Sequence, residues 1–140
     1  IDINALLESL QADAEDTGHH IEVSGVARSP YAGRPLLLKR CLSNLLDNAV
    51  KYGGKAVVQV QDTQDVLRLR IADEGPGIPE NELEQVFEPF FRLEGSRCRD
   101  TGGTGLGLSI ARNIARAHGG ELMLRNRPEG GLEAIVTLPR

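Results

Sequence analysis

The segment Leu42–Gly53, LSNLLDNAVKYG, decides the fold, because its apolar residues recur at helical spacing around two asparagines. Asparagine is a mediocre helix former, since its short amide competes for nearby backbone groups. Proline suits a first helical turn and glycines end helices, so we predict a helix from about Pro35 to about Tyr52, before Gly53 and Gly54. Its broad apolar stripe, expected to face a sheet, consists of Leu38, Cys41, Leu42, Leu45, Leu46, Ala49 and Val50.

Beside this stripe runs a narrow polar one, made of Arg40, Asn44, Asn48 and Lys51 at steps of four, four and three residues. Positions three or four apart are neighbours on a helix surface, so two amides and one ammonium point the same way. A solvated face would account for a single asparagine, whereas two aligned with a lysine indicate a site for a metal and phosphate. An asparagine carbonyl is a hard neutral ligand that suits Mg²⁺, and Lys51 would be a point charge against phosphate oxygens.

Outside this helix, the hydrophobic periodicity predicts two more main helices and about five strands. The helices are expected at 1–15 and 105–117, with a short one at 80–86, and the strands at 21–23, 55–61, 66–72, 121–125 and 132–138. Hairpins at both ends of the strand set indicate a mixed sheet with helices on one face. We therefore predict an α/β (α+β) two-layer sandwich, and not a doubly wound fold, because helices and strands do not alternate strictly enough.

Length and composition indicate one globular domain over residues 1–140. With 40% hydrophobic and 26% charged residues, the chain can bury a core without disulfides or a structural metal. The net charge of −4 argues against nucleic-acid binding. Cys41 on the apolar stripe and Cys98 in a charged loop are too few for a disulfide framework or a zinc site, and they indicate a reducing compartment.

The sequence gives no sign of a membrane segment. No apolar run is long enough to cross a bilayer, and no signal peptide opens the chain, so we expect no direct membrane insertion by this fragment. The first residue is Ile rather than Met, which we interpret as a fragment of a longer protein.

The turn Asp73–Pro79, DEGPGIP, follows a predicted strand directly. By itself such a sequence is a common turn. Its functional interpretation is a carboxylate at a strand end, with Gly75 and Gly77 letting the backbone approach a flat ligand closely. A buried, acceptor-only carboxylate would take a hydrogen bond from the exocyclic amine of adenine, whereas guanine presents an oxygen at that place. We expect Asp73 to select adenine and Glu74 to face solvent.

A glycine-rich segment, GGTGLGL at 102–108, leads into the last predicted helix. Backbone N–H groups and the helix dipole converge at such an N-terminus, which suits phosphate. The segment is not a Walker A loop, because Gly107 is followed by Leu108 and not by Lys, and no strand precedes it as a Rossmann loop requires. Glycines that cap the helix or hinge a loop explain the pattern equally well.

All three phenylalanines lie in FEPFFR, residues 87–92. Core packing of a loop is the simpler interpretation. The functional one is a lid anchored by phenylalanine side chains, with Arg92 and Arg97 reaching phosphates as forked donors. The three histidines form no nucleophilic arrangement, and His118, at a helix C-terminus, suits the helix dipole as a partly cationic ring.

Together and in this order, these segments resemble the catalytic ATP-binding domain of bacterial two-component sensor histidine kinases. NLLDNAVKYG resembles the N box of that family, DEGPGI the G1 box, FEPFFR the F box and GGTGLGL the G2 box, and the resemblance covers nearly the whole chain. It implies the Bergerat (GHKL) ATP-binding fold, which type II topoisomerases, mismatch-repair ATPases and heat-shock chaperones share. The F box and its short spacing to GTGLGL favour the kinases.

The resemblance also implies a role for each matching residue. Asn48 would be the Mg²⁺ ligand, with Asn44 beside it as polar support. Lys51 would contact phosphates, as would Arg92 and Arg97 of the lid. Asp73 of the G1 box would accept a hydrogen bond from the exocyclic amine of adenine. Further nucleotide contacts would come from Tyr52, Gly75, Gly77, Ile78, Phe90, Gly103, Thr104, Gly105, Leu106, Gly107 and Leu108.

The cofactors implied are ATP and Mg²⁺, and the implied reaction moves the γ-phosphoryl group to a histidine on a preceding dimerisation domain. No histidine of this chain fits that acceptor, since His19 and His20 lie in a turn and are followed by Ile. We therefore expect the fragment to bind Mg-ATP without phosphorylating itself. The implied partners are the histidine-bearing domain, through which the parent would form a homodimer, and a response regulator. The parent would be anchored in the bacterial inner membrane, with this domain in the cytoplasm.

Two alternatives to a kinase domain share the same fold. One is a regulatory module that binds nucleotide without transferring phosphate, and intact Asn48, Asp73 and GTGLGL argue against it. The other is an ATP-hydrolysing component of the topoisomerase or chaperone branch. The length of 140 residues, the expected lid and the absence of a transducer domain argue against that one.

Overall fold

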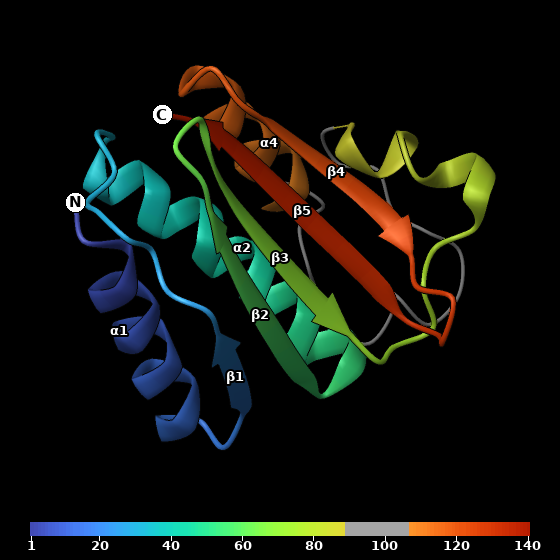
Figure 1. The fold of residues 1–140 in the computed structure, drawn as a ribbon. Coiled ribbons are helices and arrows are strands. Elements are labelled where there is room, and N and C mark those ends of the chain that lie inside the picture. The colour runs from blue at the N-terminus through green and yellow to red at the C-terminus, as the bar shows by residue number, and fades with distance from the viewer. Residues whose placement is uncertain (89–106) are drawn as a thin grey trace.

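The chain forms a five-stranded mixed sheet with helices on one face (Figure 1). The computed structural model describes residues 1–88 and 107–140. Across the sheet the strands run in the order β1 (His20–Ser24), β2 (Lys55–Asp62), β3 (Val66–Asp73), β5 (Leu132–Pro139) and β4 (Glu121–Asn126). The β1–β2 pair is parallel and the other pairs are antiparallel. The predicted fold class, a two-layer sandwich with a mixed sheet, is confirmed.

Three main helices of the described part pack beside this sheet: α1 (Ile3–Asp16), α2 (Pro35–Gly53) and α4 (Gly107–Ala117). Figure 1 shows α2 and α4 behind the sheet and α1 alongside the edge strand β1. Two 3₁₀ turns, η1 (Glu80–Glu82) and η2 (Gln85–Phe87), replace the short helix expected at 80–86. No helix within the described ranges is both long and apolar enough to span a bilayer.

The central helix α2 has the boundaries and the buried face that the sequence predicts. Pro35 occupies the first turn, and Gly54 ends the helix in the left-handed region at φ +76°, donating its N–H to the Val50 carbonyl. All seven residues of the apolar stripe are buried. Within this face the Cys41 thiol lies 3.5 Å from the Ala111 carbonyl of α4, and burial raises its pKa to about 12.

The sheet turns its apolar face toward these helices. In β3, Leu67, Leu69 and Ile71 are buried while Arg68 and Arg70 on the opposite face are half-buried. The inward residues of β5 continue the same layer, since Leu69 pairs with Val136 and Ile71 pairs with Ala134. The period-2 alternation therefore places the next inward position of β3, Asp73, at the edge of the core.

The connection between β1 and α2 is bound by side chains from distant parts of the chain. The Asn4 amide donates from Nδ2 to the Ala27 carbonyl and accepts the Ala27 N–H at Oδ1, both at 2.9 Å. The Tyr31 hydroxyl donates to the Pro139 carbonyl at 2.9 Å. This connection is therefore fixed to α1 and to the end of β5.

An ion pair between the ends of β2 and β5 also bonds the backbone of this connection. The Arg140 guanidinium donates to both oxygens of Asp62 at 2.7 Å, and the Asp62 side chain is only 3% exposed. The Arg28 N–H also donates to this carboxylate at 2.6 Å. The hydrogen bond from Arg140 is the largest of the effects that lower the pKa of Asp62.

Candidate functional site

The C-terminal end of α2 touches the end of β3, and a glycine makes this contact possible. A Cβ on Gly53 would lie 2.7 Å from the Asp73 Cβ and 2.8 Å from the Glu74 nitrogen, closer than real side chains pack. From the sequence, Gly53 was expected only to end the helix. Its lack of a side chain also lets the end of α2 approach Asp73 and Glu74. Because the backbones meet here, the residues of the last two turns of α2, Asn48 and Lys51 among them, lie near the Asp73 turn.

Asp73 is a buried acid at the end of a strand, as predicted. Its side chain is among the two buried polar residues of the described part, and the residue is 3% exposed. Oδ1 accepts the Gly75 N–H at 2.9 Å and the Leu132 N–H at 3.2 Å. Glu74 is exposed, as expected. These bonds orient the carboxyl group, and the oxygens of a carboxylate are hydrogen-bond acceptors.

The turn after Asp73 is held in shape by one amide side chain of β4. Gly77 has a φ of +74°, which other residues rarely adopt. The buried Ile78 donates its N–H to Asn126 Oδ1 at 2.9 Å, and Asn126 Nδ2 donates to the Ile78 carbonyl at 2.6 Å. The predicted residues Gly75, Gly77 and Ile78 thus lie on one short, ordered turn that begins at Asp73.

The polar stripe of α2 divides into residues with different environments. Asn44 donates from Nδ2 to the Gly107 carbonyl at 3.3 Å, which ties α2 to the first turn of α4. Asn48 is half-buried, and within residues 1–88 and 107–140 no hydrogen-bond partner of its amide is recorded. Lys51 is exposed. Asn48 thus has an amide that could ligate a cation, while Asn44 has a bond that positions the start of α4.

The donor set fits Mg²⁺ held jointly with a nucleotide. Among the described residues, no group of three or more His, Cys, Asp and Glu side chains could hold a metal ion by itself. Mg²⁺ commonly keeps several waters and takes few protein ligands together with substrate phosphates. The half-buried amide of Asn48 is such a neutral oxygen ligand, so the residues present fit the ion.

Several predicted site residues lie outside the described residues. They are Phe90, Arg92, Arg97, Gly103, Thr104, Gly105 and Leu106. The side chain of Tyr52 is likewise not described, although its backbone lies in the last turn of α2. At the near end of the gap, Gly107 begins α4 and the half-buried Leu108 packs against the core. The roles of the undescribed residues stay predictions.

The segment before residue 89 is anchored to α4. Phe87 is buried, and the Arg112 guanidinium lies 4.2 Å from the centre of its ring. Arg112 also bonds Glu84 at 3.1 Å and Glu121 at 3.3 Å. Core packing is thus confirmed for Phe87, the first phenylalanine of FEPFFR.

The comparison with known proteins decides the family. Residues 33–140 match the family described as histidine kinase-, DNA gyrase B-, and HSP90-like ATPase. The chain belongs to this ATPase family. Its membership confirms ATP as the expected nucleotide at the level of the family, and the magnesium ion remains a prediction.

Curated relatives of this ATPase domain carry the names of sensor kinases. The chain is 51% identical over 140 residues to the sensor histidine kinase GtrS of Pseudomonas aeruginosa, a match that covers 100% of the chain and 28% of that protein. It is 40% identical over 105 residues to the signal transduction histidine-protein kinase BaeS of Escherichia coli, covering 73% of the chain and 22% of that protein. The chain therefore spans about a quarter of the length of these relatives.

Solved structures agree with the fold of the ATPase domain. The nucleotide-free catalytic domain of histidine kinase ThkA superposes with a TM-score of 0.82 at 28% identity, covering 99% of the chain and 94% of that domain. The ATP-binding domain of PrrB from Mycobacterium tuberculosis gives 0.77 at 29% identity, covering 99% and 94%. The resemblance to catalytic domains of sensor histidine kinases is thus confirmed.

His118 has a structural role in this ATPase domain, at a helix C-terminus as expected. Nε2 accepts the Arg34 N–H at 3.1 Å, and Nδ1 lies 2.8 Å from the Ile114 carbonyl. The partly cationic ring stays a prediction. The ring links the end of α4 to the N-terminus of α2.

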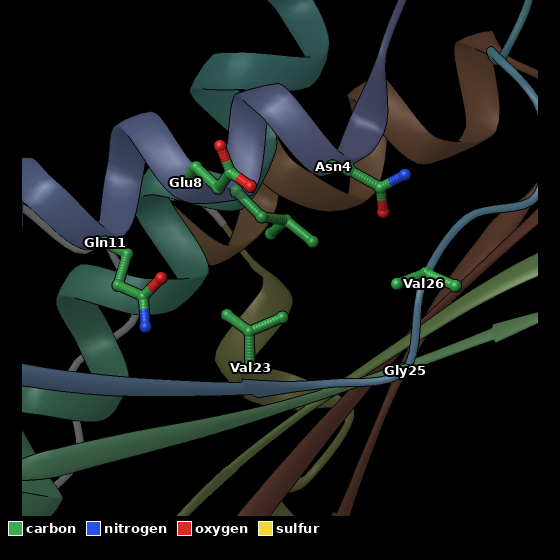
Figure 2. A pocket seen from close by; sticks show the side chains of 7 residues that line it. Asn4, Glu8, Gln11, Val23, Gly25 and Val26 are labelled. Atoms are coloured by element: carbon green, nitrogen blue, oxygen red, sulfur yellow. The ribbon is translucent and has the colours of Figure 1, made fainter.

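A surface hollow of the ATPase domain lies away from Asp73, between α1 and β1 (Figure 2). Its walls are Asn4, Leu7, Glu8, Gln11, Val23, Gly25 and Val26. None of these residues was predicted to bind nucleotide, and Gln11 and Asn4 each use their amide on a backbone carbonyl nearby. The hollow is not the candidate site.

Asn126 and Arg127 are functional-site residues that were not predicted from the sequence. They lie at the β4–β5 turn. The sequence of this stretch, RNRPEGG at 125–131, is typical of an ordinary polar turn. Arg127 Nη1 donates to the Asp73 carbonyl at 2.8 Å. Neither periodicity nor spacing reveals such a contact between segments about fifty residues apart.

Proposed function

We propose that the chain binds Mg-ATP between the end of α2 and the Asp73 turn, and that it donates the γ-phosphoryl group to a histidine on another domain of its parent protein. One observation carries this proposal: a buried carboxylate at the end of β3, oriented by backbone N–H groups, where the end of α2 meets the same turn. The names of the curated relatives support the kinase activity.

Adenine recognition follows from the chemistry of Asp73. Its carboxylate can accept a hydrogen bond from the exocyclic amine, and a purine with an oxygen at that place would leave two acceptors opposed. Gly75 and Gly77 have no side chains, so the backbone can approach the base closely. Ile78 would give the base an apolar contact.

The triphosphate would lie toward Asn48 and the start of α4. Bound Mg²⁺ would neutralise phosphate charge, with Asn48 as its protein ligand. Lys51 would act as a point charge, and Arg92 and Arg97 would contribute forked donors to the phosphates. The glycine-rich segment before α4, with Gly103, Gly105 and Gly107, would offer backbone N–H groups.

The transfer itself requires a group from outside this chain. An imidazole nitrogen of the acceptor histidine forms a bond to the γ-phosphorus, the bond to the bridging oxygen breaks, ADP leaves, and the imidazole proton passes to a neighbouring acid. Positioning and electrostatics dominate such a reaction. The acceptor would belong to a dimerisation domain of a membrane-anchored parent, and a response regulator would receive the phosphoryl group next.

The adenine site is tested by Asp73→Asn. Loss of a hydrogen bond to a charged acceptor corresponds to about 1.5–3 kcal/mol, so affinity for ATP should fall about 10- to 100-fold in calorimetric titrations. An affinity equal to that of the unchanged chain would remove Asp73 from its proposed role.

The metal site is tested by Asn48→Asp. The added negative charge should weaken binding of free ATP through repulsion and strengthen the dependence of binding on Mg²⁺. Affinities measured with Mg²⁺ and with a chelator give this dependence as a ratio. The same ratio in variant and parent would count against Asn48 as a ligand.

The kinase activity is tested by adding a separate histidine-bearing dimerisation domain and radiolabelled ATP. Label on the histidine is the expected result. Release of labelled phosphate without transfer would favour an ATPase of the same fold, and neither product with intact binding would favour a regulatory module.

A further inference from the structure

The Asp73 turn is held from one side by the β4–β5 turn, which we define as residues 126–132. The two segments are far apart in the sequence, and three separate hydrogen-bonded links join them. Each link acts on a different part of the Asp73 turn, so together they fix both its beginning and its end.

The first link is the amide of Asn126. Its oxygen accepts the Ile78 N–H at 2.9 Å and its nitrogen donates to the Ile78 carbonyl at 2.6 Å, so one side chain satisfies both backbone groups of one residue. The same nitrogen lies 3.1 Å from Glu80 Oε1. A side chain with only a donor or only an acceptor could not make this pair of bonds.

The second and third links act on Asp73 itself. Arg127 Nη1 donates to the Asp73 carbonyl at 2.8 Å, while its other terminal nitrogen pairs with Glu129 at 2.9 Å. The Leu132 N–H donates to Asp73 Oδ1 at 3.2 Å. Backbone and carboxylate of Asp73 are therefore both oriented by the β4–β5 turn.

Two glycines allow the segments to come this close. A Cβ on Gly77 would lie 2.6 Å from Asn126 Oδ1, and a Cβ on Gly131 would collide with the Asp73 carbonyl. Both glycines also have positive φ, +74° and +90°. The close contact is thus built into the backbone on both sides.

We infer that Asn126 is a positioning residue for purine recognition: by holding Ile78 it fixes the turn that aims the Asp73 carboxylate at the base. This inference rests on the proposed adenine-binding role of Asp73. Asn126 bonds the backbone of the turn, so its loss should reduce the preference for the adenine amine more than it reduces binding of the rest of the nucleotide.

The experiment compares ATP with purine riboside triphosphate, which lacks the exocyclic amine and is otherwise the same. The ratio of the two dissociation constants measures what the amine contributes. A hydrogen bond to a carboxylate should give the 140-residue chain a ratio of about 10 or more in favour of ATP. Asn126→Ala should bring this ratio to within about threefold of unity, with a smaller change for the nucleotide that lacks the amine.

Asn4→Ala is the matched control. Asn4 makes the same pair of bonds to one backbone residue, Ala27, and it lines the hollow between α1 and β1 (Figure 2), away from Asp73. Its loss removes the same two kinds of hydrogen bond, so thermal stability should fall comparably, but the ratio should stay that of the unchanged chain. Asn126→Asp, which keeps the acceptor for the Ile78 N–H and loses the donor, serves if Asn126→Ala does not fold, and should give an intermediate ratio.

Amide hydrogen exchange gives a second readout. The Gly75 N–H is bonded by Asp73 and not by Asn126, so faster exchange there in Asn126→Ala, and not in Asn4→Ala, would show that the effect passes through the turn. A parental ratio together with parental Gly75 exchange in Asn126→Ala would overturn the inference. A ratio near unity in the unchanged chain, or no change with Asp73→Asn, would instead overturn the proposed adenine role and with it this inference.

Discussion

Asp73 places a carboxyl group where the other inward residues of its strand have hydrocarbon side chains. The inward positions of β3 run Leu67, Leu69, Ile71 and Asp73, all buried. Burying an ionised group costs folding free energy unless hydrogen bonds compensate, and here two backbone N–H groups do so in part. A residue that breaks the pattern of its own strand in this way is typical of a functional position.

At the same scale, we expect even the smallest substitution of Gly53, to alanine, to destabilise the fold. Gly53→Ala places a methyl group 2.7 Å from the Asp73 Cβ, so the free energy of unfolding should fall by about 1–3 kcal/mol and ATP binding should weaken. At an unhindered helical position alanine would instead stabilise by about 0.5–1 kcal/mol. Urea unfolding and calorimetric titration measure the two effects.

The stability control is Gly107→Ala in α4. Among the described residues, the nearest atom to a Cβ there is the Asn44 Cβ at 4.0 Å, which is an ordinary contact. This variant should unfold at the same or a slightly higher urea concentration. Equal stabilisation by both substitutions would contradict the close approach of α2 to the Asp73 turn.

At the scale of elements, Arg112 joins α4 to η2 and β4. Its side chain is 17% exposed, lies over the Phe87 ring and bonds Glu84 and Glu121. Arg112→Ala should lower the free energy of unfolding by about 1–2 kcal/mol, through lost packing as well as lost charge.

Arg116→Ala provides the comparison, because Arg116 pairs with the same Glu121 at 3.2 Å but is 50% exposed. An exposed pair contributes at most about 1 kcal/mol, so this loss should be the smaller one in denaturant titrations. A larger loss from Arg116→Ala than from Arg112→Ala would contradict the contribution expected from the Arg112–Phe87 contact.

The elements themselves could be predicted closely from the sequence. Period-3.6 and period-2 patterns indicate which face of an element is buried, and glycines mark its ends, so α2, β3 and β5 begin and end within one or two residues of expectation. Strand order and the parallel pairing of β1 with β2 could not be predicted, because alternation indicates faces and not neighbours.

The candidate site was predictable only in part. Asp73, Gly77 and Asn48 belong to local patterns with a chemical meaning. Asn126 and Arg127 do not, since their function depends on contacts with residues 48 and 54 positions away. The hydrogen bond of the His118 ring to the Arg34 N–H likewise joins residues far apart in the sequence.

At the scale of the whole molecule, the Asp62–Arg140 pair makes stability depend on pH. The pKa of Asp62 is lowered in the folded state, chiefly by the hydrogen bond from Arg140. A lowered pKa means that Asp62 contributes stability above its unfolded pKa of about 3.9, and that this contribution is lost as pH falls through the lower folded pKa. Glu121, whose pKa is lowered chiefly by Arg116, acts with the same sign.

We therefore expect the free energy of unfolding to decrease as pH falls below about 5, and to decrease less in Asp62→Asn. Urea unfolding at several pH values measures this slope. Asp65→Asn, at an exposed turn position next to β3, is the control and should leave the slope as it is in the parent. An unchanged slope in Asp62→Asn would show that the pair does not couple protons to folding.

The sulfur atom of Cys41, enclosed where α2 meets α4, gives the protein a natural chemical reporter. Only a thiolate reacts readily with alkylating reagents, and a thiol with a pKa of about 12 that no solvent reaches stays inert until the two helices separate. In a Cys98→Ser variant, Cys41 is the one cysteine of the sequence, and the rate of its alkylation would measure how often the two helices separate. Slower alkylation in the presence of ATP would mean that nucleotide holds together the two helices that flank it.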